Sequence, residues 1–161
     1  MEQESGITAY LLTDEQIEIF WKYLGGSMFE ISNVLGKLIP QAENKCVETE
    51  AIKKEIDRLI SMNEGKLGFY ASINKSKRML FKEILFIHKQ KDMFRIDDLE
   101  SLVDKGFYEE TGLINELSNL VRMNILAFYP TTAHYMLQGN SMFYGLKHYI
   151  NRVFSDKKHD T

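Results

Sequence analysis

Two short groups of residues in this sequence could carry specific chemistry, and both suit recognition rather than catalysis. The first is Gly25-Gly26-Ser27, which separates two apolar segments. The second is Asn115, Asn119 and Arg122, whose spacing places them on one face of a helix. The sequence has no recognisable Ser-His-Asp setting, no His-Glu-x-x-His and no informative acidic pair. We therefore predict a chain that performs no catalysis by itself.

Asn115, Asn119 and Arg122 could contact DNA, because carboxamide and guanidinium groups read base edges in a major groove. The alternative is a solvated or protein-contacting helix face. Phosphate contacts supply most of the affinity for DNA, so nearby carboxylates oppose binding. Over the same stretch, Arg122 is outnumbered by Glu109, Glu110 and Glu116. The charge balance favours the alternative.

Other candidate contacts are basic or aromatic. Lys77 and Arg78 belong to the best basic cluster of the sequence, although such clusters are more often solvated helix faces. Tyr135 could stack on a base, but no Lys or Arg occurs between positions 125 and 143. Aromatic hairpins without cations more often pack within the protein.

Metal and cofactor sites are not indicated by the sequence. The four histidines show no ligand spacing, and Cys46 is the only cysteine. A single cysteine excludes an intramolecular disulfide and a thiolate zinc cluster, and we expect a buried or idle thiol. We predict no metal and no cofactor held by this chain alone.

Positions 76–138 must place the second group, and their pattern predicts a helix-turn-helix followed by a tight β-hairpin, the order of a winged helix. The first helix is apolar nearly all round and should be buried. Asp97 should cap a short second helix. The third helix, in the recognition position, should open at Thr111 or Gly112. Strands over 125–129 and 134–138 should flank Pro130-Thr131-Thr132, and a last helix capped at Asn140 or Ser141 should pack on the first.

The amino-terminal half must place the double glycine. The segments 13–16 and 27–30 both match the capping-box pattern. They predict that one helix begins before the glycines and another begins after them. Helical spacing of Phe20 and Trp21 predicts that both are in the core. A charged third helix over 47–62 should end before a linker at Gly65–Gly68. The predicted fold is mainly α: a small lid-like helical bundle, 1–68, followed by a winged helix-turn-helix domain with a short β-hairpin wing, 69–161.

Composition sets the class of protein. The chain has 161 residues, 44 % of them hydrophobic, which is enough for real cores. Positions 1–70 hold 7 Lys+Arg and 12 Asp+Glu, and positions 71–161 hold the remaining 13 and 11, giving -5 and +2. Neither half is the strongly basic surface of a dedicated nucleic-acid binder. Without an apolar run of spanning length or a basic, apolar start, we expect a soluble cytoplasmic protein without membrane contact.

The order of elements resembles the carboxy-terminal part of an archaeal-type ATPase family within the AAA+ and related P-loop superfamily. The resemblance rests on Leu24-Gly25-Gly26, on Phe29-Glu30-Ile31 in the next helix, and on the charged helix and winged helix that follow, over about 11–149. It implies a helical lid and a winged-helix module that follow a nucleotide-binding core. Gly25, Gly26 and Ser27 would then close over a nucleotide held by that core.

Two departures limit what the resemblance implies. Many relatives carry a basic residue just after the double glycine, where it can sense the γ-phosphate, and here that residue is Ser27. The sequence also lacks Gly-x-x-x-x-Gly-Lys-Ser/Thr, the loop that cradles phosphates. ATP would therefore act only through a missing core, on a longer chain or on a separate one. An ordinary helix-helix turn is the alternative for the glycines.

Three hypotheses follow. The first is the regulatory or interaction end of an ATPase, with the missing core or another protein as partner. The second is a free-standing winged-helix DNA binder of the transcription-regulator type. The third is a structural adaptor that dimerises through its last helix; the sequence leaves the oligomeric state open.

Overall fold

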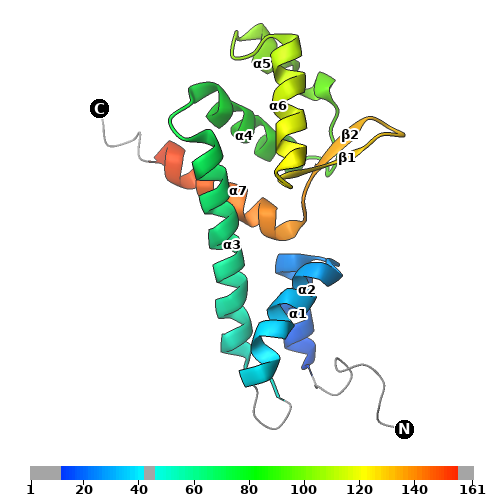
Figure 1. The fold of residues 1–161 in the computed structure, drawn as a ribbon, viewed down its shortest axis with the longest axis vertical. Coiled ribbons are helices and arrows are strands. Elements are labelled where there is room, and N and C mark those ends of the chain that lie inside the picture. The colour runs from blue at the N-terminus through cyan, green and yellow to red at the C-terminus, as the bar shows by residue number, and fades with distance from the viewer. Residues whose placement is uncertain (1–11, 42–45, 156–161) are drawn as a thin grey trace.

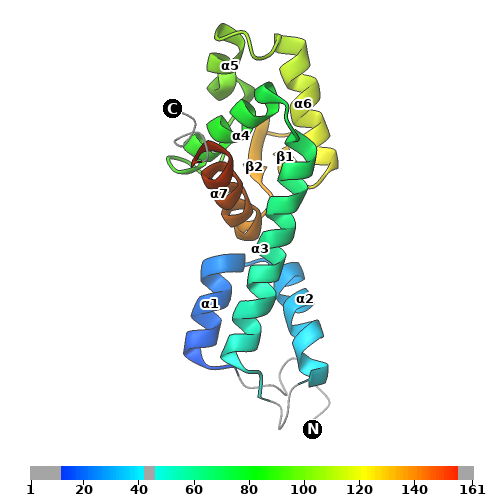
Figure 2. The same cartoon turned by 90° about the vertical axis from the view of Figure 1, so that its left-hand side faces the viewer.

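The computed structural model describes residues 12–41 and 46–155, and this part of the chain is mainly helical with one two-stranded antiparallel sheet. The molecule is elongated along its longest helix, α3 (Figure 1). Two helices, α1 and α2, lie beside the amino-terminal half of α3 (Figure 2). The remaining elements gather around its carboxy-terminal half. Each group has its own hydrophobic core.

The first group is a three-helix bundle of α1 (Asp14–Leu24), α2 (Met28–Leu38) and α3 (Thr49–Ala71), with a short η1 (Ile39–Gln41) after α2. Its core contains Phe20, Leu24, Val34, Leu35, Leu38, Val47, Ile52, Ile56 and Ile60. The predicted capping box at Thr13 is confirmed, because Thr13 Oγ1 accepts from the Gln16 amide at 3.2 Å and Gln16 Oε1 from the Thr13 amide at 3.0 Å. Gln16 Nε2 also donates to the Val47 carbonyl at 2.8 Å, which fixes α1 against the start of α3.

The linker predicted at Gly65–Gly68 is wrong, because α3 runs through it without interruption. Leu67 and Ala71, on the last turns of α3, are fully buried in the second core. A Cβ at Gly68 would lie 3.3 Å from Arg152 Nη2, so the missing side chain lets α7 approach. One helix therefore belongs to both cores and joins them.

The second group follows a tight turn after α3. Its helices and strands are α4 (Lys75–His88), η3 (Ile96–Leu99), α5 (Glu100–Asp104), α6 (Glu110–Arg122), β1 (Leu126–Tyr129), β2 (His134–Leu137) and α7 (Asn140–Ser155). A helical unit with a β-hairpin was predicted here, and the elements occur in the predicted order.

Two local predictions in this group are wrong. Asp97 does not cap the second helix, since Arg95 precedes η3 and its amide donates to Asp98 Oδ2 at 2.8 Å. The first helix, α4, has an apolar surface nearly all round, as predicted, but it is buried on one face only. Its core residues are Leu80, Phe81, Ile84, Leu85 and Ile87, whereas Phe86 is 59 % exposed. α6 begins at Glu110, one residue before Thr111, the earlier of the two predicted starts.

Both predicted strands are present, each one residue shorter than predicted, with Leu126 opposite Leu137 and Tyr129 opposite His134. Ala133, at the end of the turn, has a φ of 53°, a left-handed conformation that is uncommon for residues other than glycine. Phe94 forms an isolated antiparallel bridge with Tyr135, with backbone hydrogen bonds of 2.9 and 2.7 Å. The segment before η3 is thereby held against the outer edge of β2.

α7 closes the second group and reaches back to the first. As predicted, it packs against α4, where the Tyr149 ring meets the Phe81 ring edge-on at 5.8 Å. Its largest contact is with α3. A Cβ at Gly145 would lie only 2.8 Å from Asn63 Cβ and 3.1 Å from the Glu64 amide nitrogen, so the two helices approach closely at this glycine.

Candidate functional site

The double-glycine corner is a tight turn between α1 and α2. Gly25 caps α1 with a φ of 60° and ψ of -141°, a conformation essentially restricted to glycine, and its amide donates to the Trp21 carbonyl at 3.0 Å. Ser27 caps α2, and its Oγ accepts from the Glu30 amide at 3.4 Å. A Cβ at Gly26 would touch the Trp21 ring at 3.4 Å. The turn therefore needs a glycine at Gly25 for its backbone conformation, and the Trp21 ring packs against Gly26.

The corner contacts the segment between β2 and α7. A Cβ at Gly25 would lie 3.2 Å from Asn140 Nδ2, and this same nitrogen donates to the Lys22 carbonyl at 3.5 Å. Ser141 Oγ donates to Glu30 Oε1 at 2.5 Å. The first turn of α2 is thus hydrogen-bonded to the first turn of α7.

Ser141 is the centre of this contact. It is fully buried and accepts a hydrogen bond of 3.0 Å from Asn63 Nδ2 on α3, while it donates to Glu30. Three helices are therefore connected through one hydroxyl group. The capping-box pattern at Ser27 correctly predicted the start of α2, but only half of the box forms. Ser27 caps the helix, whereas the Glu30 carboxyl group is bonded to Ser141 and not to the Ser27 amide.

Burial raises the pKa of Glu30 above the ordinary glutamate range, and the hydrogen bond from Ser141 opposes the shift only in part. Its Oε2 is shielded from solvent and has no hydrogen-bond partner among the described residues. The physical cause is the loss of hydration of the charged form. Glu30 is a half-buried acid at the boundary between the two groups of helices.

Aromatic rings also connect the bundle to the second group of helices. Tyr23 of α1 lies 5.0 Å from Tyr144 of α7, ring centroid to ring centroid, and Tyr144 lies 5.2 Å from Phe143. Phe143 in turn lies 4.8 Å from His88 at the end of α4. Burial lowers the pKa of His88, although Asp92 opposes the shift. Four rings therefore link the bundle to α4.

An apolar surface surrounds the corner on its other side. Trp21 is 63 % exposed, Met28 65 % and Phe29 76 %. The core position predicted for Trp21 is therefore wrong, whereas Phe20 is buried as predicted. A groove of about 230 Å³ is bounded by Leu12, Ile17, Phe20, Trp21, Gly25, Gly26, Met28 and Ile31. Exposed large apolar groups around a groove are typical of a protein contact.

The predicted recognition residues are only partly brought together. Asn115, Asn119 and Arg122 are all exposed on α6. Lys77 lies beside that helix, where its Nζ is 3.8 Å from Glu116 Oε1 and 4.4 Å from the centroid of the Tyr70 ring. This ammonium group is therefore already engaged within the protein.

Arg78 and Tyr135 lie elsewhere. Arg78 Nε donates to the Ser72 carbonyl at 3.0 Å, so it supports the turn between α3 and α4. The Tyr135 ring stacks on the Phe94 ring, with ring centroids 5.7 Å apart, and contacts the Phe128 ring in a tilted arrangement at 4.8 Å. Both side chains therefore have structural contacts, and neither joins the exposed face of α6.

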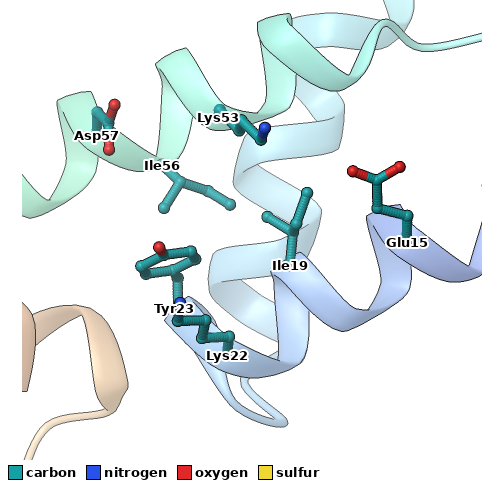
Figure 3. Close-up of a pocket in the computed structure, with 7 residues that line it drawn as sticks. All are labelled: Glu15, Ile19, Lys22, Tyr23, Lys53, Ile56 and Asp57. Atoms are coloured by element: carbon teal, nitrogen blue, oxygen red, sulfur yellow. The ribbon is translucent and has the colours of Figure 1, made fainter.

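A second groove, of about 430 Å³, lies between α1 and α3 (Figure 3). Ile19, Tyr23 and Ile56 lie between the two helices, and charged side chains of both signs flank them. Lys53 already pairs with Glu50 at 3.4 Å. The mixed charge and local pairing give this groove no evident chemistry, and we assign it no part in the site.

Comparison of the chain with protein-family models, with curated proteins and with solved structures gives no match. Within residues 12–41 and 46–155, no group of three or more His, Cys, Asp or Glu side chains could hold a metal ion. In the same ranges no helix has the length and apolarity needed to cross a membrane. Cys46 is exposed and free.

Sequence reasoning missed Glu30, Asn63, Asn140 and Ser141 as members of the site. Its signals were local: a capping-box pattern for Glu30 and helix-capping residue types for Asn140 and Ser141. The contact of Glu30 with Ser141 spans 111 positions, so spacing within one helix could not indicate it. The site is a junction of helices, built around the corner that the sequence did single out.

Proposed function

We propose that this chain is a non-catalytic regulatory and interaction module that couples the nucleotide state of a separate ATPase core to the binding of a partner. In this proposal α1 to α3 form the lid, and the elements from α4 to α7 form a winged helix. The order of helices, the hairpin and the Phe94–Tyr135 bridge support the winged-helix assignment.

The observation that carries the proposal is the contact of the double-glycine corner with α7. Gly25 lies against Asn140, and Glu30 is bonded to Ser141. A nucleotide-dependent shift at the corner would therefore be transmitted directly to the carboxy-terminal elements. The continuous α3 supports the same view, because a helix shared by two cores lets both groups move as one body.

The apolar groove beside Trp21 supplies the docking surface of the proposal. It adjoins Gly25 and Gly26, and burying it against a core would remove Met28 and Trp21 from water. Ser27 offers a hydroxyl group rather than a positive charge, so sensing of a γ-phosphate here would be by a polar contact. Trp21 is the only tryptophan and reports on docking through its fluorescence.

The test combines this chain with a P-loop core that is encoded either in the same reading frame or as a separate polypeptide of the source genome. We expect the chain alone to hydrolyse no ATP, and the complex to change Trp21 emission when Mg·ATP replaces Mg·ADP. Trp21→Phe removes the signal, and Met28→Ser weakens docking about tenfold, or about 1.4 kcal/mol. Ile114→Ser, exposed on α6, is the matched control. Turnover of ATP by the chain alone would refute the proposal.

A second candidate is a DNA-binding winged helix. It is favoured by the exposure of Asn115, Asn119 and Arg122 on α6, next to a hairpin. The same helix carries Glu110 and Glu116, and Glu116 forms an ion pair with the nearby Lys77. Since phosphate contacts dominate affinity for DNA, this charge balance supports the first proposal over the second.

A further inference from the structure

A cleft of about 480 Å³ lies where α2, α3 and the two ends of the hairpin meet. It shares none of its lining residues with the groove beside Trp21. The side chains that matter for binding are Phe29, Asn33, Asn63, Lys66, Asn124 and Gln138. They come from both groups of helices, so an occupant would contact both at once.

Carboxamide groups dominate the polar lining of this cleft. Asn63 uses its Nδ2 on Ser141, which leaves its carbonyl oxygen. Within the described residues, the side chains of Asn33, Asn124 and Gln138 make no hydrogen bond. Each carboxamide presents a donor and an acceptor side by side, a pattern that complements the edge of a nitrogen heterocycle.

Lys66 gives the cleft its available charge. Its ammonium group has no ion-pair partner in the part of the chain that the structure describes. Glu30 also lines the cleft, but Oε1 is bonded to Ser141 and Oε2 is shielded from solvent. The lining therefore offers a positive charge with no carboxylate paired to it, which favours an anionic group on the ligand.

Phe29 adds a stacking surface at the same cleft. Its ring is 76 % exposed although it lies on the first turn of a well-packed helix. In proteins that bind single-stranded nucleic acids, bases stack on aromatic side chains that line positively charged grooves. We propose that this cleft binds a small anion built on a planar nitrogen heterocycle, and that purine nucleoside monophosphates are the class that matches its lining. The volume lies in the usual range for small-molecule sites, about 300–1,000 Å³.

The position of the cleft gives this binding a consequence. Asn33 belongs to α2 and Gln138 follows β2, so the ligand bridges the bundle and the carboxy-terminal elements. A ligand that contacts both groups binds best when they are in the present arrangement and opposes their separation. The site needs no separate ATPase core, and of the double-glycine corner it includes only Ser27, which lines the cleft.

The test is calorimetric titration of this chain, residues 1–161, with AMP, adenosine, inorganic phosphate and ribose 5-phosphate. We expect saturable binding of one AMP, with at least about tenfold weaker binding of the other three. Lys66→Gln should weaken AMP binding about tenfold and leave adenosine binding unchanged. Asn33→Leu and Gln138→Leu should weaken the binding of both AMP and adenosine.

Lys54→Gln, exposed on α3 outside the cleft, is the matched control and should bind AMP normally. Far-ultraviolet circular dichroism establishes that each variant folds. Absence of saturable AMP binding up to about 5 mM would overturn the proposal. Equal binding of phosphate and AMP would overturn the role of the heterocycle, and AMP binding unaffected by Lys66→Gln would overturn the location. These titrations contain no ATPase core, so their outcomes are distinguishable from those of the ATP-dependent docking test at Trp21.

Discussion

Ser141 Oγ donates a hydrogen bond to Glu30 Oε1 across the boundary between the two groups of helices, and it also accepts one from Asn63 at 3.0 Å. Ser141 is fully buried, so bulk water cannot replace its hydroxyl group as the hydrogen-bond partner of Glu30 or Asn63. This arrangement joins the double-glycine corner to α7 through α2 and to the midpoint of the molecule through α3.

Removal of this hydroxyl tests its contribution to stability. Ser141→Ala should lower the free energy of unfolding by about 1–3 kcal/mol, because it leaves Asn63 Nδ2 and Glu30 unpaired. With Glu30→Ala in a double-mutant cycle, the coupling energy should be about 0.5–3 kcal/mol. Urea unfolding provides the measurement. Ser118→Ala is the control: its Oγ bonds within α6 at 3.0 Å, and its effect should stay within about 0.5 kcal/mol. Additive single mutants would show that the contact is energetically silent.

The pH dependence of stability should carry the signature of Glu30. Burial raises the pKa of Glu30 in the folded chain. Between the ordinary pKa and the raised pKa, the folded state therefore binds more protons than the unfolded state. Its contribution is therefore fully present below the ordinary value of 4.5 and is lost as the pH rises through the folded pKa. Glu30→Gln should be insensitive to this change, so it should gain stability relative to wild type from acidic to neutral pH. Parallel pH profiles of the two proteins would contradict the shift.

The close approach of α3 and α7 depends on Gly145. Gly145→Ala would place a methyl group 2.8 Å from Asn63 Cβ and 3.1 Å from backbone of α3, and backbone cannot rotate away. We expect a loss of about 1–3 kcal/mol, measured by denaturant unfolding. Gly112→Ala in α6 is the matched control, because nothing lies within 4 Å of its Cβ position. It should be neutral or stabilising by up to about 1 kcal/mol, and similar losses at both glycines would refute the packing argument.

DNA binding separates the two candidate functions. Fluorescence anisotropy with a labelled mixed-sequence duplex at low salt should give no saturable binding, because α6 carries more acidic than basic side chains. Binding that falls steeply with added salt, and in which Arg122→Ala relaxes base preference, would instead establish the winged-helix DNA binder. Lys54→Gln, on the opposite group of helices, serves as the charge-matched control.

Much of the element order could be predicted from the sequence because its signals are local. The capping box at Thr13, the strands on either side of Pro130 and the helices of the second group depend on neighbouring residues. The linker prediction failed because glycine weakens a helix by only about 1 kcal/mol, which burial of Leu67 and Ala71 outweighs.

The candidate site was less predictable, since its contacts are distant in sequence. Trp21 has the helical spacing of a core residue, but α1 is covered only on the side of Phe20 and Leu24. Spacing identifies an apolar face and not how far neighbouring helices cover it. Glu30 had a plausible local partner in Ser27, and its actual partner lies 111 positions away.

The proposed coupling between the corner and α7 is tested most directly by hydrogen–deuterium exchange of Gly25→Ala. The substitution imposes about 1–3 kcal/mol of backbone strain and presses a methyl group on Asn140. Gly36→Ala, in α2 with open space at its Cβ position, is the control. We expect exchange of the amides at 140–144 to rise about fivefold or more in Gly25→Ala alone, with α6 unchanged. Unchanged exchange at 140–144 would mean that the corner and α7 are independent, and it would contradict the account.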